Sequence, residues 1–137
     1  MSNPINFIQD EIVEEFSQFE NGIDKYHYLI KLGKNIKYNA RIREDHNLIS
    51  NCQSKVWLVS QNDDGNLRFD IDSDAAITKG IISLIIRAVN NQTPETVYNT
   101  DLYFIEKIGL KSNLSPARSD GIKSIITHVK EIALNNC

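Results

Sequence analysis

The chain has 137 residues, enough for one domain over residues 1–137, and its 41% hydrophobic and 24% charged residues are typical of a folded protein. Fifteen Lys and Arg against 18 Asp and Glu give a net charge of -3, which argues against a strongly basic nucleic-acid-binding protein. An acidic N-terminus, the lack of any run of about 18 apolar residues and two cysteines without a CxxC spacing favour a cytoplasmic protein with no membrane segment or signal peptide.

The first part of the chain predicts two helices and a long polar connection. A helix start at Pro4 is followed by apolar residues at three- and four-residue steps to about Glu20. A second helix is predicted from about Asp24 to Gly33. Residues 34–51 show no clean period, and a connection of this length usually has a function.

A β-hairpin is predicted next, with strands at 56–60 and 67–71 around a turn at 62–65. The second strand alternates apolar and charged residues, so we expect its charged residues, Asp72 included, on the outer face. A third strand is expected from 34–50, which would give an antiparallel sheet of about three strands.

Four further helices follow the hairpin. A long one is predicted from Ile77 to about Asn90, two short ones begin near Pro94 and cover 104–108, and the last begins at Pro116. Strands and helices that do not alternate indicate an α+β fold, here a small antiparallel sheet packed against helices on one side.

Cys52 is the main candidate for chemistry. The chain has no glycine-rich phosphate loop, and its His and Cys residues lack metal-ligand spacing, so no cofactor or metal site is expected. Cys52 ends the polar connection just before the strand at Val56, where a thiolate could be reached and act as a nucleophile. A buried cysteine that only packs is the alternative, and position does not decide between them. Trp57 is expected in the core, and the terminal Cys137 is interpreted as incidental.

Four stretches of the sequence resemble the SufE family in order and spacing. Asn51–Leu58 resembles the family motif GCQSxVW, and Lys25–Gly33 resembles KYxxLIxLG. Asp72–Gly80 resembles DSDAAIVKG, and Leu114–Gly121 resembles LTPSRSxGL, so the resemblance covers essentially the whole chain. One departure is Asn51, where the family usually has Gly. Because Asn tolerates a left-handed backbone, we expect the loop to keep its shape.

Members of this family accept sulfur from cysteine desulfurases in iron–sulfur cluster assembly, and the resemblance implies the same role here. Cys52 would take persulfide sulfur from a SufS-like desulfurase, stimulate that enzyme and pass the sulfur to a SufB-containing scaffold. The protein would then be a sulfur relay and not an enzyme. It would need no cofactor, since pyridoxal phosphate (PLP) belongs to the desulfurase. A SufE/IscU-like fold and a monomer or weak homodimer are expected.

The resemblance also implies roles for residues around the cysteine. Arg118 would lie beside the cysteine loop and serve docking or thiolate stabilisation, whereas the ordinary interpretation is a solvated cation. Asp74 would tune how that loop opens, whereas the ordinary interpretation is a helix N-cap. Gln53 and Ser54, inside the motif, are further candidates for docking or loop tuning.

Other functions remain open at this point. An IscU-type cluster scaffold would need several Cys or His ligands, and only Cys52 is well placed. A Cys–His hydrolase would need a positioned base and an oxyanion hole, for which the sequence has no motif. An acceptor for a paralogous Csd-type desulfurase would carry the same motif, so the choice of desulfurase is left open.

Overall fold

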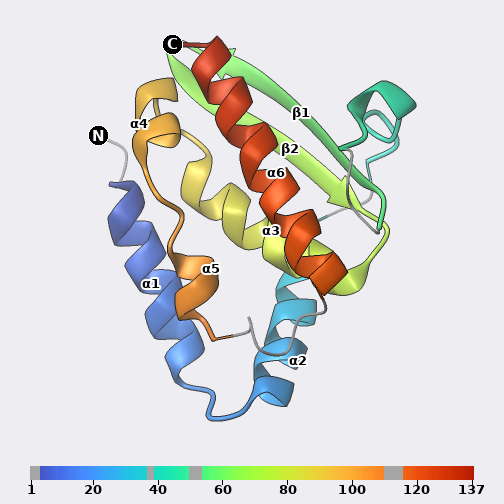
Figure 1. Cartoon of the computed structure of the whole chain (residues 1–137), viewed down its shortest axis with the longest axis vertical. Coiled ribbons are helices and arrows are strands. Elements are labelled where there is room, and N and C mark those ends of the chain that lie inside the picture. The colour runs from blue at the N-terminus through green and yellow to red at the C-terminus, as the bar shows by residue number, and fades with distance from the viewer. Residues whose placement is uncertain (1–3, 37–38, 50–53, 110–115) are drawn as a thin grey trace.

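The computed structural model describes residues 4–36, 39–49, 54–109 and 116–137, without the side chains of 116–118. Helices α1 (Ile5–Ser17) and α2 (Gly22–Gly33) come first, followed by a 3-10 turn η1 (Asp45–Asn47) and a hairpin of β1 (Val56–Asp63) and β2 (Asn66–Ser73). Four helices complete the chain: α3 (Ala76–Val89), α4 (Pro94–Asn99), α5 (Phe104–Lys107) and α6 (Pro116–Asn135). The predicted α+β class and the predicted order of helices and hairpin are confirmed (Figure 1).

The hairpin is longer than predicted because a two-residue turn joins its strands and leaves more residues free to pair. Asp64 and Gly65 both have positive φ, 51° and 93°, as a two-residue turn of type I′ requires. This turn continues the strand twist, so pairing runs from Val56 opposite Ser73 up to the turn itself. An Asp-Gly pair is among the residue pairs that tolerate such a backbone at low cost.

Within the described residues the sheet has two strands, where the sequence predicted about three. The expected third strand, from 34–50, contributes a single bridge, Leu48 opposite Trp57. One hydrogen bond extends it, from the Ile49 N–H to the Val56 carbonyl at 2.9 Å. The connection lacks an alternating pattern, so it has no apolar face with which to form a longer strand.

Helix α3 is the centre of the fold. It contacts β2, α2 and α1, and Figure 1 shows it between the hairpin and the N-terminal helices. Its crossing with α2 depends on two glycines. A Cβ on Gly80 would lie 2.3 Å from the Leu29 carbonyl oxygen, and a Cβ on Gly33 would lie 2.7 Å from the Gly80 nitrogen. The motifs Lys25–Gly33 and Asp72–Gly80 therefore meet in one close helix contact.

Helix α6 closes the other side of the molecule and packs against α4. Lys130 joins the two helices, since its Nζ donates to the Val97 and Tyr98 carbonyls, both at 3.1 Å. These carbonyls belong to the last turn of α4, where a helix leaves acceptors without partners of its own. No helix in the described ranges has the length and apolar character that crossing a membrane would require.

Candidate functional site

Cys52 and Gln53 lie outside the described residues, but the chain on both sides of them is described. On the upstream side Ile49 is buried and bonded to Val56 at the start of β1. On the downstream side Ser54, the remaining predicted motif residue, is half-buried and leads directly into β1. The segment that carries Cys52 therefore begins and ends at the same end of the hairpin.

The downstream end is held by Ser73, the last residue of β2, and by Asp74, which follows it. The Lys55 backbone N–H donates to the Asp74 carboxylate at 3.1 Å. The Lys55 carbonyl accepts hydrogen bonds from the Ser73 hydroxyl at 2.8 Å and from the Asp74 N–H at 3.3 Å. Asp74 is not the N-cap of α3, because Ala75 occupies that position without a side-chain cap. Its carboxylate instead holds the chain next to the Cys52 segment.

A buried carboxylate lies under this anchor. The Asp72 side chain is 1% exposed, and its Oδ2 accepts hydrogen bonds from Arg43 Nε at 2.8 Å and the Asn39 N–H at 3.4 Å. Its Oδ1 accepts from the Ser73 N–H at 2.8 Å and lies 3.8 Å from Lys79 Nζ. Burial alone would raise the pKa of Asp72, but the hydrogen bonds from Arg43, Ser73 and Asn39 outweigh it and lower the pKa.

Arg43 contacts three groups at once. Besides Asp72, it donates from Nη2 to the Ser73 carbonyl at 3.2 Å, and its guanidinium lies 4.6 Å from the centre of the Trp57 ring. Trp57 and Asp72 face each other across the hairpin, so Arg43 covers the outer face of this cross-strand pair. The cation–π contact and the ion pair together bury that face.

The burial of Asp72 corrects the sequence-based expectation that it lies on an exposed outer face. Asp70, two residues earlier on the same face, is exposed as predicted, but the last three residues of β2 are all buried. The connection before the hairpin packs over the Asp72 side of this end through Arg43 and Asn39, and α3 packs against β2. One signal was available: Val56–Val59 is apolar on both faces, which is typical of a strand covered on both sides. Trp57 is buried as predicted, at 6% exposure, but stands outside the main apolar cluster.

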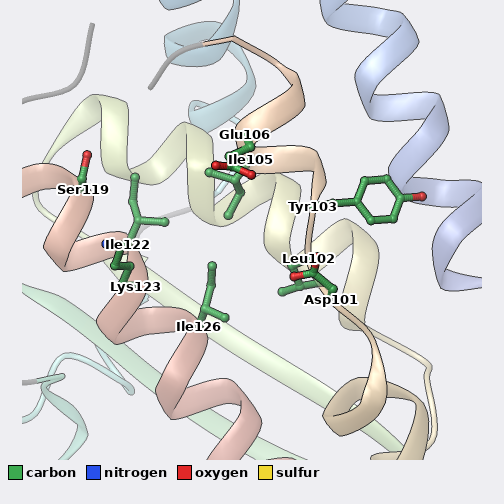
Figure 2. A pocket seen from close by; sticks show the side chains of 9 residues that line it. All are labelled: Asp101, Leu102, Tyr103, Ile105, Glu106, Ser119, Ile122, Lys123 and Ile126. Carbon is green, nitrogen blue, oxygen red and sulfur yellow. The ribbon is translucent and has the colours of Figure 1, made fainter. Parts of the chain in front are cut away.

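The described backbone places Arg118 in the first turn of α6, and its side chain is outside the description. Close to this turn, a cavity of about 220 Å³ opens between α5 and α6 (Figure 2). The cavity is lined by Asp101, Leu102, Tyr103, Ile105, Glu106, Ser119, Ile122, Lys123 and Ile126. None of these residues belongs to the described anchor of the Cys52 segment.

Two further observations concern metals and the second cysteine. Among the described residues, no three His, Cys, Asp or Glu side chains come together as a metal site would require. Cys137 is exposed at the end of α6, where its thiol donates to the Ala133 carbonyl at 3.3 Å. The neighbouring Asn136 accepts a hydrogen bond from the Asn62 side chain at 3.4 Å, so Cys137 lies near the turn of the hairpin, at the opposite end from the Cys52 segment.

Comparison with known proteins gives the same fold and a family. A protein from Thermus thermophilus, described as hypothetical and solved in solution, matches with a TM-score of 0.75 and 14% identity, over 94% of this chain and 95% of that one. At this identity the match establishes the fold alone. The family model of SufE, described as an Fe-S metabolism associated domain, matches residues 10–133. Because that match spans nearly the whole chain, including Cys52 and the residues that anchor its segment, the chain belongs to the SufE family.

Proposed function

We propose that this protein is a sulfur acceptor that takes persulfide sulfur from a cysteine desulfurase onto Cys52. The observation that carries the proposal is the SufE match over residues 10–133, which includes the cysteine motif. The family is associated with iron–sulfur metabolism, and sulfur delivery is the contribution that a single reactive thiol can make to it. The protein is then a relay and an activator of the desulfurase, with PLP held by that partner.

The transfer needs no oxidant or reductant. The Cys52 thiolate attacks the outer sulfur of the desulfurase persulfide, a new S–S bond forms, and the desulfurase cysteine leaves as a thiolate. Cys52 then carries the persulfide. In the second step a thiolate of a SufB-containing scaffold attacks the outer sulfur, and Cys52 returns as a thiolate. One sulfur atom moves in each step, and the number of thiolates and S–S bonds is conserved.

The surroundings of the Cys52 segment support this role. Its two ends are fixed to β1 and to the residues at the end of β2, so a short stretch of chain can be presented to a partner from a rigid base. Asp74 acts on this base through Lys55, and we assign it the tuning of the loop. Gln53, Ser54 and Arg118 are assigned to docking of the partner.

Intact mass spectrometry tests the proposal. The protein is incubated with a SufS-like desulfurase, PLP and cysteine, and we expect a gain of about 32 Da, one sulfur atom, that a reductant removes. Cys52→Ser should abolish both this gain and the stimulation of cysteine turnover, while Cys137→Ser should leave both intact. A Cys52→Ser protein that stimulates turnover as well as the wild type would overturn the proposal.

Two further assays test the alternative functions, an acceptor for a Csd-type desulfurase and an IscU-type cluster scaffold. Repeating the mass measurement with a Csd-type desulfurase shows which desulfurase loads the protein faster, and so identifies the partner system. Incubation with ferrous iron and sulfide tests an IscU-type scaffold. A stable coloured cluster on the wild type that is also retained by Cys137→Ser would favour the scaffold over the relay.

A further inference from the structure

Arg43 connects the two ends of the segment that carries Cys52. It belongs to the polar connection that leads into Ile49, the upstream end. Its guanidinium reaches Asp72 at 2.8 Å and the Ser73 carbonyl at 3.2 Å. Ser73 in turn holds the downstream end, since its hydroxyl donates to the Lys55 carbonyl at 2.8 Å. One side chain therefore joins the connection that leads to the segment with the anchor beyond it.

We propose that Arg43 is a positioning residue for sulfur transfer, acting through Asp72 and Ser73 to fix the separation and orientation of Ile49 and Lys55. The inference rests on the proposed function of Cys52 and adds to it a residue that sets how the thiol is presented. The described contacts of Arg43 are with Asp72, Ser73 and Trp57. Its effect passes through the backbone on either side of Cys52.

The chemistry of the cluster requires an arginine. The guanidinium donates in two directions from one plane, to a carboxylate and to a carbonyl, while its face lies on Trp57. A lysine keeps the charge, but its donors all radiate from one ammonium nitrogen and it has no planar face, so it cannot reproduce the guanidinium's spacing between Asp72 and Ser73 together with its contact on the Trp57 ring. Arg43→Lys is therefore the informative variant, because it retains the ion pair and removes the geometry.

The energetics of the cluster also favour a positional role. A carboxylate with 1% exposure facing an arginine with 21% exposure gives little net stability, since desolvation offsets much of the attraction. Apolar side chains would cover Trp57 at least as well. What an ion pair adds and an apolar contact lacks is direction, and the direction here is toward the residue that holds Lys55.

Amide hydrogen exchange tests the coupling without any partner. In Arg43→Lys we expect exchange at the Ile49 and Lys55 amides to rise about tenfold. The Leu67 amide, bonded to the Gln92 carbonyl at 2.8 Å far from this cluster, should not change. Arg41→Lys is the matched control, the same substitution on an exposed side chain of the same connection. A uniform rise at all three amides, or no change at Ile49 and Lys55, would overturn the proposal.

Desulfurase kinetics then test the consequence for transfer. In the Cys137→Ser background, Arg43→Lys should lower the maximal stimulated rate about tenfold and leave the half-saturating concentration within about twofold, because presentation of the thiol changes and the docking surface does not. An unchanged maximal rate, or a rise in half-saturating concentration alone, contradicts the assignment. If the wild type accepts no sulfur, the proposed function fails. The exchange experiment still decides whether Arg43 holds the two ends.

Discussion

Two carboxylate–arginine clusters in this molecule use the same chemical groups at different depths. At the junction of α1, α2 and α3, Glu15 accepts a hydrogen bond from Tyr28 and pairs with Arg87 at 2.8 Å. At the end of the hairpin, Asp72 pairs with Arg43 at the same distance. The Glu15 and Arg87 side chains are 24% and 37% exposed, whereas Asp72 is 1% and Arg43 21% exposed.

The difference in depth changes what each cluster does. Water and salt screen the Glu15 cluster, so its charges contribute little and its members can be exchanged at low cost. The Asp72 carboxylate is shielded from water and salt, so each of its oxygens needs protein donors in fixed positions. The shallow cluster links three helices, while the buried one holds a specific backbone geometry beside the Cys52 segment.

The largest expected effect comes from disrupting the α2–α3 crossing, which lies between the two clusters. Helix α2 carries Tyr28, and α3 carries both Arg87 and Lys79, so the α2–α3 crossing positions members of each cluster. Gly80→Ala would place a Cβ 2.3 Å from the Leu29 carbonyl oxygen, and the helices must separate. We expect a loss of about 3 kcal/mol or more in the free energy of unfolding, measured with urea.

Gly65→Ala is the matched control for that variant. Gly65 has a φ of 93° in the hairpin turn, and nothing lies within 4 Å of the added Cβ. Its cost should be about 1 kcal/mol, from the backbone alone. Equal losses at Gly65 and Gly80 would show that the close helix contact is not what makes Gly80 necessary.

The next effect compares the clusters directly. Asp72→Asn keeps the shape and removes the charge that faces Arg43, and we expect a loss of about 2 kcal/mol, less than a fully buried pair because Arg43 retains some exposure. Glu15→Gln should cost about 0.5 kcal/mol. Chemical denaturation of both variants in the same buffer measures the two values. A larger loss for Glu15→Gln would reverse the ranking by depth.

Acid unfolding sharpens the same comparison. Burial raises the pKa of Asp72, but hydrogen bonds, chiefly from Arg43, lower it overall below 3.8. A carboxyl with a lowered native pKa contributes stability that is present above its unfolded value and is lost as the pH falls through the native value. Asp72→Asn should therefore flatten the decline in stability below about pH 4. The measurement is the unfolding midpoint in urea from about pH 6 to about pH 2, and an unchanged slope would contradict it.

The helices and strands were predicted well from the sequence wherever the spacing of apolar residues indicates directly which residues are buried. The helices and the hairpin follow from apolar spacing and from the Asp64-Gly65 turn, and Cys52 follows from its motif. The cluster at Asp72 was missed for a physical reason. Alternation along β2 describes one exposed face, but the chain from 39 to 49 folds back over the end of that face. Such a contact between distant segments leaves no period in either of them.

The absent third strand has the same cause. Residues between 34 and 50 were expected to pair with β1, yet in the described part only Leu48 and Ile49 do so. Arg43 and Asn39 instead direct polar groups at Asp72. The polar composition of this connection is the composition that a buried carboxylate needs around it.

The smallest expected effect concerns the shallow cluster at high pH. Burial and the hydrogen bond to Glu15 raise the pKa of Tyr28 from 10.0 to about 12. A group with a raised native pKa contributes stability that is complete below its unfolded value, so this contribution is present below pH 10 and is lost as the pH rises toward about 12. Tyr28→Phe should cost about 0.5 kcal/mol or less at neutral pH, because Glu15 keeps Arg87 as a partner. It should also show a smaller decline in unfolding free energy between about pH 10 and about pH 12 than the wild type.

Tyr98→Phe, at an exposed position on α4, is the control and should decline as the wild type does. If Tyr28→Phe declined as steeply, the hydrogen bond to Glu15 would contribute nothing measurable, and the shallow cluster would reduce to its Glu15–Arg87 ion pair.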